Sequence, residues 1–505
     1  MDVKALKDKI LQLAIQGKLV PQNEKDEPAS VLLERIKEEK EQLIKDKIIK
    51  KEKPLQEITD DEKLFDLPNG WEWCRLGSIC KQITDGAHKT PKYIDSGIPF
   101  LSVKDISRGY IDFSDTKYIS EEEHNSLISR CNPQRNDLLF CRIGTLGRFK
   151  VIDIDAEFSI FVSLGLIKLS NNIYPKYMEY VLNSPELYNQ YYKIKVDGSH
   201  TSKLNLRDIP NLKIPLPPLE EQKRIVSKVD SLFKLIDELD SNKQDLLQNI
   251  SDTRNKVLQL AIEGKLITQE ENDEPASVLL EKMKKEKEQL IKDKIIRKEK
   301  AFPDITDDEK TFNIPNGWEW CRLCDIGIYK KGPFGSTITK SMFVPKSENT
   351  IKVYEQKNAI QKDWKLGDYY VTKEYFEEKL KGFEVFEGDI IVSCAGTIGE
   401  TYIMPSGIER GVINQALMRI KLFNGINIEY FLMYFDFILK ETSKESSKGS
   451  AIKNIPPFDI FKKMLLPLPP LEEQKRIVEK IEKIMSYLDK IEENIKNKDI
   501  LNERI

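Results

Sequence analysis

Short glycine-rich segments, such as TDGAHKTPKY at 84–93 and YKKGPFGSTITKS at 329–341, concentrate side chains that can bind phosphate or base edges. Arg and Lys pair with phosphates and guanine, Gln and Asn pair with adenine, and Gly lets backbone amides approach phosphate. The candidate DNA contacts in the first half of the chain are His88, Lys89, Thr90, Lys92, Lys104, Arg108, Arg142, Arg148, Ser199, His200 and Lys203. Those in the second half are Lys330, Lys331, Ser336, Lys340, Gln356, Lys357, Asn358, Lys448, Ser450, Lys453 and Asn454. A solvated polar loop would look similar, but these clusters occupy corresponding places in two otherwise different segments.

Catalytic motifs are missing from the sequence. IPPF at 455–458 has Ile455 where an amino-methyltransferase needs a polar residue, so we interpret it as a loop turn. No GxxxxGK(S/T) phosphate loop occurs. DDEK at 307–310 is duplicated at 60–63 beside a linker proline, which favours a linker over a nuclease element. Cys321 and Cys324 form a lone pair where zinc needs four ligands. The sequence therefore predicts no catalytic, metal or cofactor site.

Composition limits the class of protein further. The 505 residues include 80 Lys+Arg and 83 Asp+Glu, for a net charge of −3, which excludes DNA binding through a large global positive charge. The length predicts roughly three domains. Seven irregularly spaced cysteines favour a reducing cytoplasm, and no apolar run of membrane-spanning length or secretory signal is visible. We therefore expect a cytoplasmic protein with no membrane partner.

The elements that must position these side chains belong to an internal repeat. LQLAIQGKLV at Leu11 recurs as LQLAIEGKLI at Leu258, 247 residues later, and PNGWEWCRL at Pro68 recurs at Pro315. PLPPLEEQKRIV at Pro215 recurs at Pro467, 252 residues later. The stretches 77–137 and 324–389 barely match each other. Because drift alone rarely spares a frame while its inserts diverge, we favour two variable recognition modules on a fixed scaffold.

A long helix follows each PLPPLEEQ block. Apolar residues recur every seven positions at Val229, Ile236, Ile250 and Val257, a pattern typical of coiled coils. A helix over 219–264 would be about 67 Å long at 1.5 Å per residue. The C-terminal helix from Leu471 and the N-terminal segment together reconstruct a second copy. We expect the two to pair antiparallel with pseudo-two-fold symmetry, as a circular repeat.

The inserts have the pattern of α/β modules, so we assign the α+β class. Short apolar stretches at 98–103, 137–144 and 158–169 predict strands, and helical patterns follow at 174–192 and 427–443. A charged helix is expected over 29–53 and again over 276–300. The predicted regions are helical 1–67, module 1 at 68–218, central helical 219–314, module 2 at 315–470 and C-terminal helix 471–505.

These duplicated blocks, the helices after PLPPLEEQ and the two divergent inserts resemble the specificity subunit of type I restriction–modification systems over essentially the full chain. The resemblance implies that each insert is a target-recognition domain that reads one half of a split, asymmetric DNA site, with the helices fixing the gap. It also implies docking of two methyltransferase subunits and of restriction subunits. The candidate docking residues, on the helix faces that begin at Glu220 and Glu472, are Glu220, Glu221, Arg224, Glu472, Glu473 and Arg476.

The resemblance places S-adenosylmethionine on the methyltransferase partner and ATP with Mg²⁺ on the restriction partner, and none of them on this chain. It therefore implies a non-catalytic subunit. Two alternatives stay open at this point. One is a fused nuclease or methyltransferase relative, which the missing duplicated catalytic set disfavours. The other is a structural coiled-coil scaffold, or a decayed DNA-binding subunit without a functional restriction partner.

Overall fold

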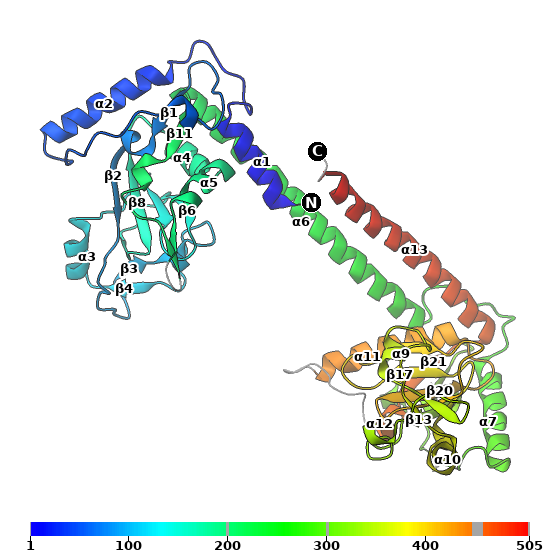
Figure 1. Cartoon of the computed structure of the whole chain (residues 1–505). Helices are drawn as coiled ribbons and strands as arrows, with labels where there is room; N and C mark the ends of the chain where they lie inside the picture. Colours follow the sequence, from blue (N-terminus) through cyan, green and yellow to red (C-terminus); the bar gives the residue numbers. More distant parts are fainter. Residues whose placement is uncertain (1, 198–200, 299–301, 447–457, 503–505) are drawn as a thin grey trace. The chain divides into compact units, whose positions relative to one another are not determined.

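The computed structural model describes residues 2–197, 201–298, 302–446 and 458–502. The chain divides into two compact units, residues 1–244 with 498–505 and residues 245–497. Each unit contains one α/β module and part of the repeated helices (Figure 1). The expected mixture of helices and sheets is confirmed. The boundary between the two units falls inside helix α6 (Leu219–Ile262), within the central helical region predicted over 219–314.

Module 1 contains a four-stranded sheet of order β2-β8-β5-β6 and a three-stranded sheet of order β4-β3-β7. Its strands, with those that close or extend the module, are β1 (Glu72–Arg75), β2 (Cys80–Asp85), β3 (Ile98–Leu101), β4 (Lys117–Ile119), β5 (Leu138–Cys141), β6 (Gly147–Val151), β7 (Ser159–Ile160), β8 (Leu164–Leu169), β9 (Val196–Asp197), β10 (Ser202–Lys203) and β11 (Lys213–Leu216). The helices of this unit besides α6 are α1 (Val3–Ile15), α2 (Ala29–Lys45), α3 (Glu121–Ile128), α4 (Pro175–Leu182) and α5 (Pro185–Lys193).

Module 2 has a four-stranded sheet of the equivalent order β13-β20-β17-β18, whereas its second sheet, of order β15-β14-β19-β16, has four strands instead of three. Its strands are β12 (Glu319–Arg322), β13 (Gly327–Lys331), β14 (Thr350–Tyr354), β15 (Tyr370–Thr372), β16 (Glu384–Val385), β17 (Ile390–Ser393), β18 (Thr401–Ile403), β19 (Gly411–Ile413), β20 (Leu417–Leu422) and β21 (Leu465–Leu468). The helices of this unit besides α6 are α7 (Ala276–Lys292), α8 (Leu323–Ile326), α9 (Gln356–Ile360), α10 (Lys373–Tyr375), α11 (Ile428–Ser446), α12 (Phe458–Phe461) and α13 (Leu471–Asn502).

The repeated sequence blocks close each module at its two ends. In module 1 the WEWCR segment forms β1, which pairs antiparallel with β11, so that Trp73 lies opposite Pro215. In module 2 the same segment forms β12 and pairs with β21, so that Trp320 lies opposite Pro467. Two blocks that are far apart in the sequence are therefore one structural element, which explains why they recur together.

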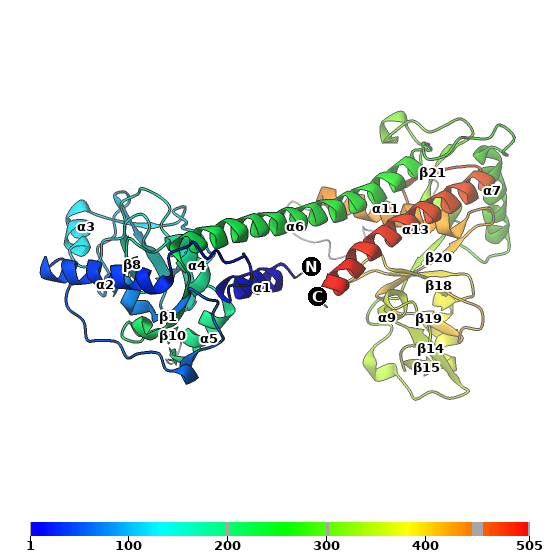
Figure 2. The same cartoon turned by 90° about the horizontal axis from the view of Figure 1, so that it is seen from above.

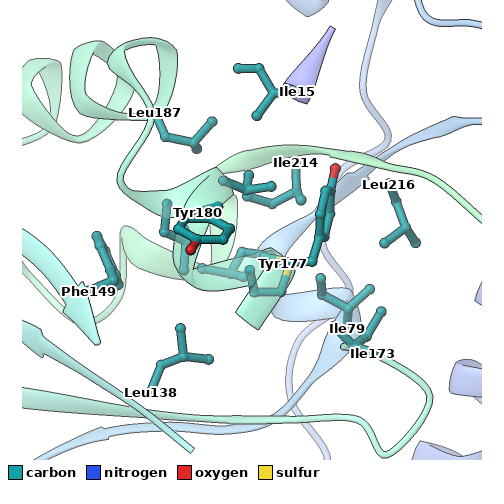
Figure 3. Packing of buried hydrophobic residues seen from close by; sticks show 14 of the residues in the cluster. Ile15, Ile79, Leu138, Phe149, Ile173, Tyr177, Tyr180, Leu187, Ile214 and Leu216 are labelled. Atoms are coloured by element: carbon teal, nitrogen blue, oxygen red, sulfur yellow. The ribbon is translucent and has the colours of Figure 1, made fainter. Parts of the chain in front are cut away.

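The core of unit 1 lies around α4. Figure 3 shows Tyr177 and Tyr180 of this helix among Phe149 of β6 and Ile214 and Leu216 of β11. Tyr177 is fully buried, and its hydroxyl donates to the carbonyl oxygen of Pro215 at 2.8 Å. Its equivalent in unit 2, Tyr430, donates to Pro467 at 2.7 Å. Each module is thus fastened to the strand that leads into its long helix.

Each half of α6 packs against a different terminal helix. In unit 1, α1 joins Val229 and Ile236 of α6 in one apolar cluster. In unit 2, α13 contributes Ile477 and Ile481 to a cluster with Val257 of α6, and both views show α13 beside this half of α6 (Figures 1 and 2). Val229, Ile236 and Val257 of the predicted apolar seam are therefore buried in clusters with a terminal helix.

The structure differs from two expectations about helices. The pattern over 174–192 forms two helices, because Ser184 caps α5 and Pro185 occupies its first turn, which ends α4. The charged helix expected over 29–53 ends at Lys45, where Lys47 adopts a left-handed conformation with φ of 59°. Its copy ends in the same way at Lys292, with Lys294 at φ 59°.

Candidate nucleic-acid interface

A buried carboxylate gathers cations at the end of β2 in module 1. Asp85 is 1% exposed and accepts from Arg142 at 2.7 Å, from His88 at 3.1 Å and from Arg130. The side chains of His88 and Arg130 remain half exposed or more, at 60% and 51%, whereas that of Arg142 is 13% exposed. Arg142 therefore positions the cluster, and His88 and Arg130 present its exposed hydrogen-bonding groups.

Arg142 also ties two loops together. Its Nε donates to the carbonyl oxygen of Leu204 at 2.9 Å, and Ile143 forms an isolated bridge with Lys203. The amide of Gly144 donates to the carbonyl oxygen of Ser202 at 3.0 Å. The RIGTLGR loop consequently lies beside strand β10 and the loop that follows β2. The structure brings Lys203 and the exposed His88, Lys89, Thr90 and Lys92 to one edge of the module.

The loops of module 2 leave the sheet at equivalent positions. Gly332 donates to the carbonyl oxygen of Leu417 at 2.9 Å, as Gly86 donates to Leu164 at 3.2 Å. This register places Lys331 where module 1 has Asp85. Cys394 occupies the position that Arg142 has in module 1. The amide of Cys394 donates to the carbonyl oxygen of Ala416, as the amide of Arg142 donates to that of Ser163. The two modules share a frame but differ in charge at its loops.

Gln356 joins two of these loops in module 2. Its Nε2 donates to the carbonyl oxygens of Ala395 and, at 3.2 Å, of Thr397. Burial raises the pKa of the neighbouring Cys394 thiol to about 12, while the nearby Lys331 ammonium acts in the opposite direction. Lys331, Gln356 and the CAGTIG loop therefore lie together in this module.

Asn358 is not part of this surface. It is fully buried, its Oδ1 accepts from the amide of Glu355 at 2.7 Å, and its Nδ2 donates to the carbonyl oxygens of Asp363 and Leu366, each at 2.9 Å. Asp105 does the same in module 1, where it accepts from the amide of Ser102 at 2.6 Å. The prediction that Asn358 contacts DNA is wrong, because its amide caps a turn inside the module.

The remaining candidates are mostly exposed. Lys104 pairs with Asp115 at 2.8 Å, and its equivalent Lys357 pairs with Glu355 at 2.8 Å. Arg108, Arg148, Lys330, Ser336 and Lys340 are exposed, and Lys330 lies over the ring of Phe383 at 4.8 Å. Ser199, His200, Lys448, Ser450, Lys453, Asn454 and most of the IPPF turn lie outside the described residues.

The candidate docking residues at the start of α6 behave in two ways. Glu220 is exposed and pairs with Lys223 at 2.6 Å. Glu221 is 1% exposed and accepts from Nε1 of Trp71 at 3.0 Å and from Gln22 at 3.1 Å. Burial raises the pKa of Glu221, although these hydrogen bonds and Arg224 oppose the shift. Arg224 is partly exposed and pairs with Asp26 at 2.6 Å.

The start of α13 repeats this geometry. Glu472 is exposed beside Lys475, and Arg476 pairs with Asp273 at 2.5 Å. Glu473 is 1% exposed and accepts from Trp318 at 2.9 Å and from Gln269 at 3.0 Å. Because Glu221 and Glu473 are used inside their own units, they do not belong to a docking surface, and that prediction is corrected for both.

Asp85 and Arg130 belong to the cluster at the end of β2 but are not among the residues that the sequence predicts as DNA contacts. Arg130 follows α3 and lies 45 residues from its partner, in a segment with no glycine-rich or basic cluster. Asp85 lies within the TDGAHKTPKY segment, but an acidic residue was not expected at a DNA surface. The only available signal was that Asp85 directly precedes a loop rich in cations.

Other features of the chain are structural in what is described. Cys321 and Cys324 are buried, and the Sγ of Cys321 donates to the carbonyl oxygen of Leu466. Among the described residues, no three His, Cys, Asp or Glu side chains gather as a metal site would require. Within the same ranges, no helix has the length and hydropathy needed to cross a bilayer.

Comparison with known proteins gives consistent matches. The family model described as type I restriction modification DNA specificity domain matches twice, at residues 68–249 and 315–498. The chain is 27% identical to the type I restriction enzyme EcoAI specificity subunit of Escherichia coli, over 98% of this chain and 91% of that one. It is 26% identical to the EcoEI specificity subunit of the same organism, with the same coverage.

A solved structure supports the fold. A chain from a study of complex assembly and conformational transition of the type I R-M system aligns with a TM-score of 0.51 at 19% identity. The alignment covers 87% of this chain and 96% of that chain.

Proposed function

The chain belongs to the family of type I restriction–modification DNA specificity domains, and from that premise we propose that it is the specificity subunit of such a complex. It reads a split, asymmetric DNA site with module 1 on one half and module 2 on the other. It is itself non-catalytic, and it directs methyltransferase and restriction subunits to that site, as the names of its relatives suggest.

The observation that carries this proposal is a shared frame with unlike loops. The sheets β2-β8-β5-β6 and β13-β20-β17-β18 have equivalent strand orders. At the start of the corresponding loops, however, module 1 has Asp85 with its paired arginines and module 2 has Lys331. A single symmetric site would favour identical loops. Two frames with different hydrogen-bonding and charged groups suit two different base sequences, because base edges are distinguished by their donors and acceptors.

We also propose that two methyltransferase subunits dock on the repeated helices. The exposed pairs Glu220–Lys223 and Glu472–Lys475 offer the same surface twice, which suits two copies of one partner. Arg224 and Arg476 remain partly exposed at the same place in each unit. S-adenosylmethionine is assigned to these partners, and ATP with Mg²⁺ to restriction subunits. We expect the complex to act on double-stranded DNA in the cytoplasm.

The pseudo-two-fold circular repeat and the antiparallel coiled coil are part of the proposal. Lys7 pairs with Asp237 at 2.6 Å in unit 1, and Arg254 pairs with Asp489 at 2.6 Å in unit 2. These pairs are related by the sequence offsets of 247 and 252 residues. α1 therefore corresponds to the second half of α6, and the first half of α6 corresponds to α13. Each pair of helices is held by an equivalent ion pair.

The experiment is a module exchange. The chain is co-expressed with its methyltransferase partner in a host without other methylation systems, and N6-methyladenine is mapped across the genome. Residues 77–214 are then replaced by the matching segment of another specificity subunit. We expect a split motif in which one half changes and the other half is kept. A change in both halves would contradict modular reading, and a stable complex with no methylation would favour a scaffold.

A further inference from the structure

Phe334 is unusually exposed for a phenylalanine. Its relative exposure of 88% is the highest of the large apolar side chains that the described residues contain. It lies in the GPFGS loop directly after β13. An isolated ring in water forgoes the stabilisation that burial of an aromatic side chain gives, so its place in the loop is not explained by folding of the module.

The loop that carries Phe334 is fixed at its base. A Cβ atom on Gly332 would lie 1.8 Å from the carbonyl oxygen of Asn414, so only glycine fits where the chain leaves the sheet. The amide of Thr337 donates to the carbonyl oxygen of Phe334 at 2.8 Å, which closes a turn. The ring is therefore presented by a hydrogen-bonded turn on an anchored strand end.

Module 1 presents a different side chain at the same place. Gly86 is the counterpart of Gly332, and a Cβ atom on it would lie 2.0 Å from the carbonyl oxygen of Ile160. Two residues beyond each glycine stand His88 and Phe334. His88 is exposed and hydrogen-bonded to Asp85 at 3.1 Å, whereas Phe334 offers only an apolar surface. The same point of the frame thus carries polar chemistry in one module and apolar chemistry in the other.

The surroundings of Phe334 are cationic. Lys331, the last residue of β13, is exposed, and it makes no ion pair within the part of the chain that the structure describes. Lys340 is exposed at the far end of the loop. Lysines without a carboxylate partner suit binding to the phosphate backbone of DNA. An aromatic ring beside them suits contact with the DNA bases.

We propose that Phe334 is a specificity-determining residue that makes an apolar contact to a base in the half-site read by module 2. The inference rests on the proposed function. His88 occupies the corresponding point over the other half-site and contacts it with hydrogen bonds. The apolar contact has two possible forms, a thymine methyl group in the major groove or the face of a base that the ring stacks on.

The test compares Phe334→Ala with Phe386→Ala in the full chain bound to its methyltransferase partner. Phe386 is 51% exposed and lies in the same module, in the turn before β17. The loop of Phe334 lies near the other end of β17, so Phe386 is an exposed ring away from the proposed contact. Both substitutions remove an exposed ring, so neither should unfold the module. Methylation motifs and DNA affinities at fixed salt are measured for both variants and the wild-type complex.

We expect Phe334→Ala to lose discrimination by about tenfold to a hundredfold at one or two neighbouring base pairs of the module 2 half-site. The module 1 half-site and the Phe386→Ala complex should keep the wild-type preference. Replacing a thymine at the affected base pairs by uracil, which lacks the methyl group, separates the two forms of contact. If the ring contacts the methyl group, the wild-type complex on uracil DNA should lose the same discrimination as Phe334→Ala. If the ring stacks on the base, the wild-type complex should keep its discrimination on uracil DNA.

A Phe334→Ala complex with the wild-type motif and affinity would overturn this inference while leaving the proposed function in place. A wild-type complex without any sequence preference would overturn both. The two failures are therefore distinguished within one experiment.

Discussion

Asp85 and Lys331 occupy the same position in the two modules and carry opposite charges. Asp85 is buried and surrounded by Arg142, Arg130 and His88, whereas Lys331 is exposed. A buried carboxylate is tolerated only when it is paired, and the paired guanidinium depends on it equally. Asp85 and Arg142 are therefore expected to act as a unit that holds the loops of module 1 in place.

A double-mutant cycle tests that unit. Asp85→Ala leaves the guanidinium of Arg142 largely buried without its carboxylate and should lower the free energy of unfolding by about 3 kcal/mol. Asp85→Ala combined with Arg142→Ala should cost clearly less than the sum of the single changes. Urea unfolding measures each value. Lys331→Ala is the matched control and should stay within about 0.5 kcal/mol of the wild type; additive costs would show that the two residues act independently.

At the scale of elements, the first turns of α6 and α13 are fastened by the same network. Glu221 and Glu473 each accept from a tryptophan and a glutamine of the preceding repeat block. Burial raises the pKa of both carboxyls above the ordinary value of 4.5. A raised folded pKa means that the folded chain holds the proton more tightly than the unfolded chain. Stability from these groups is complete below about pH 4.5 and is lost as pH rises through the folded pKa.

The pH dependence of the variant Glu221→Gln/Glu473→Gln follows from that sign. Glutamine resembles the protonated carboxyl, so the variant should match the wild type at low pH and gain relative stability as pH rises. Melting temperatures between pH 4 and pH 8 measure the difference. The exposed neighbours supply the control, because Glu220→Gln/Glu472→Gln should not show this rising advantage. If the double variant instead became less stable than the wild type as pH rises, burial would not be the dominant influence on these two carboxyls.

At the scale of the whole molecule, each module has its own apolar cores and α6 runs without a break from one unit into the other. The length of this helix is therefore independent of the loops that carry the candidate DNA contacts. Base preference and the gap between half-sites should be separable properties of the chain.

An insertion in α6 tests that separation. Four helical residues placed after Asp245, in an exposed stretch of the helix, lengthen it by about 6 Å at 1.5 Å per residue, close to two base pairs of B-DNA. Methylation mapping should show the same two half-sites with a gap about two base pairs longer. The same four residues inserted after Gly407, in the exposed turn between β18 and β19, should leave the gap unchanged. An unchanged gap after the α6 insertion would show that this helix does not set it.

Several elements of the architecture follow from local features of the sequence. The long helices are predicted to start at Leu219 and Leu471, where α6 and α13 begin. Strands were predicted within 98–103, 137–144 and 158–169, where β3, β5 and β7 with β8 lie. These features depend on periodicity and on proline or glycine at nearby positions, which are local properties of the chain.

Which side chains remain available to a ligand depends on how the chain folds. Glu220 and Glu221 are adjacent residues of the same type, but the helix turns one toward solvent and the other toward Trp71. Asn358 and Gln356 lie in one short motif, yet Asn358 is buried as a turn cap. Burial and hydrogen bonding depend on partners that are distant in sequence, as Arg130 is from Asp85. Residue type and spacing therefore cannot distinguish a side chain that contacts a ligand from one that supports the fold.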